Sequence, residues 1–394
     1  MAPGVDPRLV VDPETRFSCS GCGRCCTAAW AIAVSEAKRD EILARPWAEH
    51  GVDPATLLRP LGKGLWALTK QAGSNRCVML ADDGLCDLHR HWGERAKPQM
   101  CVRFPHLAVP SAEAVWVTAN YGCKAVQEGL GPALPTHSEA LGQTFAAELA
   151  AIRPDADIGY PIGPGHVVGG DELHSLVESL CDALGDDLFS ALATLAAFTA
   201  DSSTASTQPA LSAPPTPSGV SGDVRYALAL TLYSDAVDAT SFWGRTRGVL
   251  ALPRMLGFGH RYTSRLTGAS IDMGVVFAHP GTVLEEAQAL LLAWLRARLR
   301  GRQVLKDAPH FAAGVTRLLL QAACVLYFAR ALAPGQAIGR AKALKALEAV
   351  ELYIANQQVV ATLAKLDPRL IRLWQDPAVA AGAAALFTPA ADQT

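Results

Sequence analysis

Four cysteines stand close together near the start of the chain, within the run FSCSGCGRCC. Cys19, Cys22 and Cys25 follow one another at steps of three residues, and Cys26 is adjacent to the last of them. Thiols at this spacing can converge on one centre in a tight turn, and the two glycines between them give the backbone the freedom to do so. Iron–sulfur proteins use C-x-x-C-x-x-C to hold three irons of a cubane, with a fourth thiolate from farther along. The spacing therefore predicts a thiolate-bound metal centre.

The identity of the metal and the number of centres stay open. Zinc takes one C-x-x-C pair together with a second, distant pair of ligands, and adjacent residues rarely direct both thiolates to one ion. Cys26 then serves a second site or packs as a small hydrophobe. The first third of the chain holds enough thiols for two four-coordinate sites, or for one cluster with spare thiols. The candidate metal ligands are Cys19, Cys22, Cys25, Cys26, Cys77, Cys86, Cys101 and Cys123.

Composition narrows the class of protein. Half of the 394 residues are hydrophobic, which predicts a folded globular chain, and a formal net charge of −2 does not support nucleic-acid binding by bulk electrostatics. The first residues lack the apolar stretch of an export signal, so we expect a cytoplasmic protein whose thiols bind metal rather than form disulfides. The run LLLQAACVLYFA, closed off by Arg317 and Arg330, is too short to cross about 30 Å of hydrocarbon and predicts a buried helix and no membrane partner.

A second block of cysteines identifies a resemblance. The segment RCVMLADDGLCDLHRHWGERAKPQMCVRFPHL carries Cys77, Cys86 and Cys101. The run C-x-x-C-x-x-C-C followed by a C…DGLC…C-x-x-F-P block resembles the YkgJ-type cysteine-cluster family of zinc- or iron-chelating proteins. The wording DGLCDLHRHWG is most similar to the flagellin lysine-N-methylase branch, as are CCTAAWAIAV and the NYGC run at Cys123. The resemblance covers residues 17 to about 125.

The resemblance implies more than the spacing does. It implies a [4Fe–4S] cluster and transfer of a methyl group from S-adenosylmethionine to lysine side chains of flagellin. The alternative is a non-catalytic zinc- or iron-binding module that acts through a protein partner. The chain has no Gly-x-Gly-x-x-Gly motif after a strand, which argues against an ordinary methyltransferase fold. The sequence assigns no catalytic residue and no site for the methyl donor.

Histidines among the later cysteines could replace a thiolate as ligand. His89, three residues after Cys86, is the best placed, and His91 and His106 are the others. The simpler interpretation of each is a surface or hydrogen-bonding histidine. Asp82 and Asp83 precede a glycine, so we interpret them first as turn residues and second as an acidic patch that attracts lysine.

The elements that must position these residues suggest an α+β protein. Residues 1–130 form an irregular cysteine-cluster domain, with strands in LWALTK and VWVTANY and a helix that begins after Ser35. A small irregular domain of this kind usually needs a staple such as a metal. We expect a helical segment over 131–200, a Ser/Thr/Pro-rich linker over 201–223 and an α-helical domain over 224–394.

The helical part carries local signals. Thr282 and Glu285 have the spacing of a capping box at the start of a helix. An amphipathic helix is predicted from the steps between Leu344, Leu347, Val350 and Ile354. GYPIGPGHVVGGDE predicts a loop before a helix that begins after Asp171. Four arginines from Arg296 to Arg302 predict a solvated helix end, and the buried core is expected to include Cys181 and Cys324.

Overall fold

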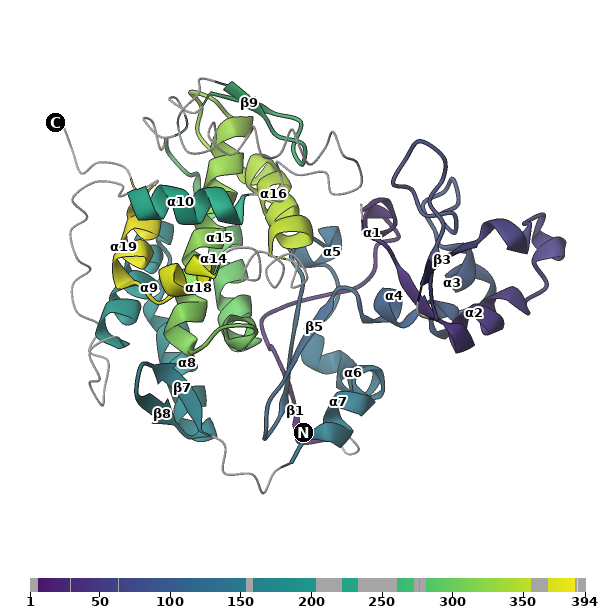
Figure 1. Ribbon diagram of the computed structural model, residues 1–394, viewed down its shortest axis with the longest axis horizontal. Helices are drawn as coiled ribbons and strands as arrows, with labels where there is room; N and C mark the ends of the chain where they lie inside the picture. Colours follow the sequence, from purple (N-terminus) through teal and green to yellow (C-terminus); the bar gives the residue numbers. More distant parts are fainter. Residues whose placement is uncertain are drawn as a thin grey trace.

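The computed structural model describes residues 6–28, 30–62, 64–153, 159–202, 222–232, 261–272, 276, 281–355, 368–386 and 388. A smaller cysteine-rich lobe, formed by residues 24–103, stands to one side of a larger helical part (Figure 1). Small sheets combined with a helical C-terminal region confirm the predicted α+β class. Of the predicted linker, residues 203–221 lie outside the described residues, and the residues on either side of them belong to helices.

Two three-stranded sheets form the scaffold of the N-terminal third. One has the strand order β1-β6-β5, with β1 parallel and β5 antiparallel to the central strand. The other has the order β2-β4-β3 and is antiparallel. The strands predicted in LWALTK and VWVTANY are confirmed as β4 and β6. The bounds are β1 Leu9–Val11, β2 Ala33–Ser35, β3 Leu58–Gly62, β4 Leu65–Leu68, β5 His106–Pro110 and β6 Val115–Ala119.

Short helices connect these strands. The helix predicted after Ser35 is confirmed as α2, because the Ser35 hydroxyl accepts a hydrogen bond from the Lys38 backbone N–H at 3.3 Å and so caps the first turn. The helices of this third are α1 Arg24–Thr27, α2 Glu36–Leu43, α3 Asp87–Trp92, α4 Gln99–Arg103 and α5 Lys124–Gln127, with 3-10 turns at Trp47–His50, Pro54–Thr56 and Glu94–Ala96.

The connection to the helical part begins with two helices and a hairpin. Phe145 and Leu149 pack with Leu9, Val115 and other side chains of the first sheet in a small core of their own. GYPIGPGHVVGGDE, predicted as a loop, instead forms an antiparallel hairpin before the expected helix. The elements are a 3-10 turn at Leu134–His137, α6 Ser138–Thr144, α7 Ala146–Ala151, β7 Tyr160–Gly163, β8 His166–Val168 and α8 Gly170–Ala183.

The largest hydrophobic core lies in the helical part, around α15 (Figure 1). Helix α15 packs against α9, α16 and α19. Cys181 and Cys324 are buried in this core, as predicted. The remaining elements are α9 Leu188–Ser202, α10 Gly222–Thr231, β9 Arg261–Thr263, β10 Ser270–Asp272, α14 Glu285–Arg300, a 3-10 turn at Gln303–Leu305, α15 Phe311–Leu332, α16 Arg340–Ala349, a π-helix at Val350–Ile354, α18 Arg369–Trp374 and α19 Pro377–Ala385.

Helix α15 is longer than the sequence analysis suggested. The helix continues through both Arg317 and Arg330, which are buried, so the prediction that they close it off is wrong. By length and composition alone this helix could cross a membrane, and its apolar window is wholly buried inside the fold. The predicted buried helix is therefore confirmed.

The start of α14 also differs from the prediction. The N-cap is Leu284, and no side chain caps the first turn, so the predicted capping box of Thr282 and Glu285 is wrong. The Thr282 carbonyl instead accepts a hydrogen bond from the Ile338 N–H at 2.8 Å, and the Leu284 N–H donates to the Ile338 carbonyl at 3.0 Å. This strand-like pairing holds residues 282–284 extended and leaves Thr282 outside the helix.

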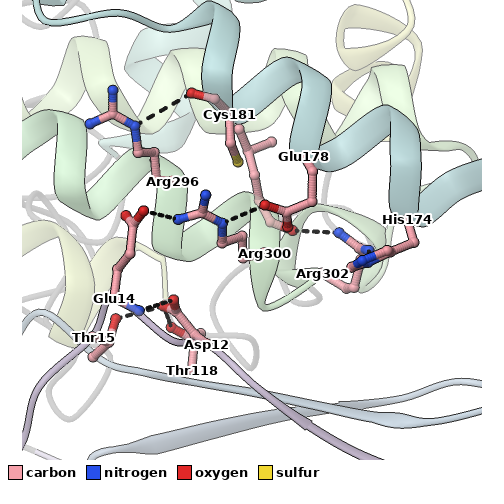
Figure 2. Close-up of polar contacts among 11 residues, drawn as sticks. Asp12, Glu14, Thr15, Thr118, His174, Glu178, Cys181, Arg296, Arg300 and Arg302 are labelled. Carbon is pink, nitrogen blue, oxygen red and sulfur yellow. Dashed lines mark hydrogen bonds and ion pairs between the residues drawn. The ribbon is translucent and has the colours of Figure 1, made fainter. Parts of the chain in front are cut away.

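The arginines at the end of α14 are not solvated, contrary to the prediction. Arg300 lies between Glu14, at 2.6 Å, and Glu178, at 2.9 Å (Figure 2). Arg302 is fully buried, stacks 4.1 Å from the Trp116 ring and lies 3.2 Å from His174 Nδ1. These contacts tie the N-terminal segment and β6 to α8 and to the end of α14.

Replacing Gly314 in α15 with alanine should lower the stability of the protein, although this change usually stabilises a helix. A Cβ at this position would lie 1.8 Å from the Val304 carbonyl oxygen, whereas a Cβ on Gly142 in α6 would lie 4.0 Å from its nearest neighbour. Alanine normally stabilises a helix interior over glycine by about 0.5–1 kcal/mol. We expect G142A to follow that rule and G314A to destabilise the protein by about 1–3 kcal/mol through overpacking. Urea unfolding measures both, and equal effects would contradict the close approach.

Candidate metal centre

The first cysteine loop, residues 19–26, has the turn geometry expected from its glycines. Gly21 and Gly23 have φ values of 66° and 67°, in the left-handed region that glycine adopts without strain. The Cys26 N–H donates to the Gly23 carbonyl at 3.0 Å, and α1 begins at the next residue after Gly23. The two glycines therefore adopt the left-handed conformations that the turn of this loop requires.

This loop lies directly against the later cysteines. The Cys77 N–H donates to the Cys26 carbonyl at 2.7 Å. Gly84, in the turn before Cys86, comes so close to the loop that a Cβ on it would lie 3.0 Å from the Gly21 carbonyl oxygen. All ten cysteines are free. The two cysteine segments thus meet in space without a disulfide between them.

Five of the eight predicted ligands form one group. The sulfur atoms of Cys25 and Cys26 lie 3.9 Å apart. Electrostatic interaction with Cys77 and Cys86 contributes to the raised pKa of Cys26, and the same two thiols contribute to that of Cys101. We call this set the five-thiol group: Cys25, Cys26, Cys77, Cys86 and Cys101.

The other three cysteines lie at the edge of this group. Cys19 and Cys22 are exposed, whereas Cys123 is half-buried. Burial raises the pKa of Cys123 to about 11, with smaller contributions from Cys22 and Cys25. Cys25 therefore lies within electrostatic reach of both the five-thiol group and Cys123.

The protonation states of the thiols suit a metal that displaces protons. The hydrogen bond with Cys26 lowers the pKa of Cys25 to about 7, and the same bond raises the pKa of Cys26. Burial raises the pKa of Cys101 to about 12 and also raises those of Cys77 and Cys86. Zinc or iron would bind as these thiols lose their protons, so metal affinity increases with pH.

The donor set fits a soft thiolate metal, although the side chains are not closed around one. Among the described residues, no three His, Cys, Asp or Glu side chains converge in metal-binding geometry. Soft thiolate donors favour zinc, iron–sulfur clusters and copper(I). The five thiols come from neighbouring loops and short helices and line one cavity.

The three candidate histidines have different surroundings. The exposed His89 and the half-buried His106 line the same cavity as the five-thiol group. His91 instead stacks on His50 with ring centroids 3.7 Å apart. Asp83 accepts a hydrogen bond from the Leu85 N–H at 3.1 Å, which confirms its interpretation as a turn residue.

His106 predicts a pH dependence of stability. Burial, with a smaller contribution from His137, lowers the pKa of His106 from 6.5 to about 4. Between those values the unfolded histidine is protonated and the folded one is neutral, so stability falls as the pH drops through this window. The loss attributable to His106 is up to about 3 kcal/mol. Urea unfolding from pH 7 to 4 should show a shallower loss for H106Q than for the unmodified chain. Parallel curves would contradict the assignment.

A cavity extends from the thiols into the helical part. It has a volume of about 730 Å³, and its lining includes the five-thiol group at the cysteine-rich lobe. Arg317 and Gln321 of α15 line it as well, together with Glu351 of the π-helix. A volume of this size is typical of a small-molecule site. No sequence signal joins residues so far apart in the chain, and the sequence analysis missed this cavity.

The cysteine-rich lobe is an irregular α+β unit whose thiols lie together on short loops. This arrangement is that of a thiolate metal-binding domain. Residues 18–124 match the family model "CxxCxxCC: Putative zinc- or iron-chelating domain". This match confirms the resemblance to the cysteine-cluster family and covers both cysteine segments up to Cys123. The match does not assign the chain to the flagellin lysine-N-methylase branch of that family. Neither the comparison with curated proteins nor the comparison with solved structures gave a match.

Proposed function

We propose that the cysteine-rich lobe holds a [4Fe–4S] centre and that the protein transfers methyl groups from S-adenosylmethionine to lysine side chains of flagellin or of another protein. One observation carries the proposal: thiols from both cysteine segments line one end of a cavity large enough for a small cofactor. The C-x-x-C-x-x-C spacing of the sequence supports iron over zinc, and of its three cysteines only Cys25 belongs to the five-thiol group. We place the reaction in the cytoplasm, where thiols stay reduced.

The surroundings of the cavity support methyl transfer chemically. A lysine can attack a methyl sulfonium only after it loses its proton, and desolvation lowers the pKa of an amine that enters such a cavity. Thiolates of the five-thiol group would hold the cluster, and a cluster held by three of them would leave one iron open to bind the amino-acid end of the methyl donor. A cavity that holds both reactants would position the amine and the methyl donor for attack.

The alternative function has an observation of its own. Leu85 and Met100 are exposed hydrophobic side chains, at 45% and 37%, and both belong to the cavity lining next to the cysteines. Exposed apolar side chains beside a site can contact another protein. A non-catalytic zinc- or iron-binding module would use them to bind its partner.

Metal analysis of protein purified without oxygen separates these functions. A brown protein that absorbs at about 400 nm and contains iron and sulfide supports the cluster. A colourless protein with stoichiometric zinc supports the non-catalytic module and excludes the cluster. The C181S variant serves as a control, because its thiol is buried outside the five-thiol group and should leave the metal content unchanged.

Catalysis is tested with flagellin and methyl-labelled S-adenosylmethionine. We expect label on flagellin lysines with the metal-loaded protein and none with C77S. The absence of label with a fully loaded centre would contradict the methylase assignment while leaving the metal centre intact. Electron paramagnetic spectra of the reduced protein should change when the donor is added, and unchanged spectra would contradict an open iron.

A further inference from the structure

One face of the central helix α15 forms a wall of the cavity. Gly314, Arg317, Leu318 and Gln321 line it, at the three- and four-residue steps that place side chains on the same side of a helix. The arginine and the glutamine on this face are both buried, at 7% exposure each. A core helix thus presents two polar side chains to an internal space.

The charge of Arg317 lacks a carboxylate partner in the described part of the chain. Its Nη2 atom donates to the backbone carbonyls of Gln303, at 3.1 Å, and Val304, at 3.4 Å. Burial lowers the pKa of Arg317 to about 10, which still leaves it protonated at neutral pH. The Trp374 ring lies 5.3 Å from the guanidinium, and the Asp307 carboxylate is near enough to oppose the lowering of its pKa, but neither forms an ion pair with it. A buried charge that no carboxylate contacts directly is costly, and an anion in the cavity would offset that cost.

Lys306 adds a second cation to the cavity lining. It is half-buried, and no described carboxylate forms an ion pair with it, although Asp307 and Glu148 are near enough to oppose the lowering of its pKa by burial. Other arginines that line the cavity are already paired, since Arg103 lies 2.6 Å from Glu148 and Arg298 forms an ion pair with Glu351. Arg317 and Lys306 therefore line the cavity without a described carboxylate at ion-pairing distance, and Asp307 acts on both only from farther away.

The backbone beside these cations is held in an uncommon conformation. Asp307 has a φ of 58°, in the left-handed region that side chains other than glycine rarely adopt. The absence of a side chain on Gly314 lets the segment around Val304 approach α15 closely.

The remaining walls indicate the class of ligand. Apolar side chains such as Leu107, Phe145 and Leu318 line the cavity, which suits an organic body rather than an inorganic ion. Asp307 also lines it and would repel a second negative charge on the ligand, whereas the charge of Glu351 is matched by Arg298. A carboxylate carries one charge and matches the two-donor edge of a guanidinium.

We propose that Arg317 and Lys306 form a carboxylate-binding subsite for a small organic molecule whose other end faces the five-thiol group. This subsite goes beyond the proposed function, because it requires neither a particular metal nor methyl transfer. The subsite would fix the orientation of the ligand in the cavity, with its anionic group at the helical wall and its opposite end toward the thiols.

Thermal unfolding of the full chain tests the subsite with acetate, butyrate and hexanoate as probes, at an ionic strength matched with chloride. The rise in Tm should grow with chain length, reaching about 2 °C at a hexanoate concentration roughly five times its Kd. Hexanamide, which lacks the charge, should give no rise. The R317Q variant should lose the response, and K306Q should weaken it.

Arg302 provides the matched control for Arg317. It is also a buried arginine without a carboxylate ion pair among the described residues, burial lowers its pKa to about 10 as well, and it is not part of the cavity lining. R302Q should therefore keep the hexanoate response, whatever its own Tm. An equal response in R317Q, a response to hexanamide or a larger response to phosphate would each overturn the proposal.

A chemical measurement covers the case in which R317Q does not fold. Phenylglyoxal modifies arginines, and mass spectrometry of the unmutated protein locates the modified positions. Hexanoate should slow modification of Arg317 and leave that of the exposed Arg16 unchanged. Equal rates at Arg317 with and without hexanoate would overturn the subsite. Neither assay contains S-adenosylmethionine or flagellin, so its outcome is distinct from that of the methylase test.

Discussion

Replacing Cys77 with serine should remove the metal from the cysteine-rich lobe and destabilise the loaded protein by several kcal/mol. Cys77 is 2% exposed, lies in the core of that lobe and belongs to the five-thiol group. A serine hydroxyl is a poor ligand for zinc or iron, so the centre loses a donor. Structural zinc contributes roughly 10–16 kcal/mol to small metal-stapled domains, which sets the upper range of the loss.

The control for C77S is C181S. Cys181 is 1% exposed, packs in the core of the helical part, and burial raises its pKa as it does that of Cys77. Both variants bury a hydroxyl in place of a thiol, so the cost of that exchange is common to them. Metal content and urea unfolding, each measured with and without chelator, isolate the contribution of the metal. Equal effects of the two variants would contradict a metal role for Cys77.

The C22S variant tests whether the metal ligands are confined to the five-thiol group or include cysteines of the exposed first loop. Its thiol is exposed, so serine at this position removes no packing. If Cys22 binds metal, C22S lowers the metal content and destabilises only the metal-loaded protein, while the chelated forms of the variant and the original chain unfold alike. Unchanged metal content in C22S together with metal loss in C77S would restrict the centre to the five-thiol group.

The local features of the fold could be predicted because they depend on neighbouring residues. The cap at Ser35, the strands β4 and β6 and the left-handed glycines of the first cysteine loop are set by side chains within a few positions. The capping box at Thr282 failed for the opposite reason. A backbone pairing with Ile338, more than fifty residues away, determines the conformation there.

The partners of the buried charges and the position of the cavity could not be predicted from neighbouring residues. Four basic residues at the end of α14 have the local pattern of a solvated helix end, but their partners come from distant segments such as Glu14 and Glu178. The cysteine spacing predicted the type of ligand, whereas the grouping of five thiols depends on how two loops pack. The cavity is defined by elements from both ends of the chain, so only tertiary structure reveals it.

Glu351 is the residue outside the cysteine-rich lobe whose loss should have the largest effect on stability. Its side chain is fully buried and forms an ion pair with Arg298. It also accepts hydrogen bonds from Trp294 Nε1, at 2.7 Å, and from the Tyr121 backbone N–H, at 3.1 Å. We expect E351A to destabilise the protein by about 3–5 kcal/mol, because it leaves the Arg298 charge buried without a partner.

A double-mutant cycle separates the ion pair from the other contacts of Glu351. R298M replaces the cation with an apolar side chain of similar length, so E351A should cost much less in the R298M background than in the original chain. Urea unfolding of the four proteins measures this coupling, and additive costs would show that the ion pair contributes little. Glu351 also contacts the segment that leads to Cys123, two residues after Tyr121. A drop in metal affinity in E351A, with R298M alone unaffected, would therefore show that the π-helix positions the edge of the metal centre through the Tyr121 hydrogen bond.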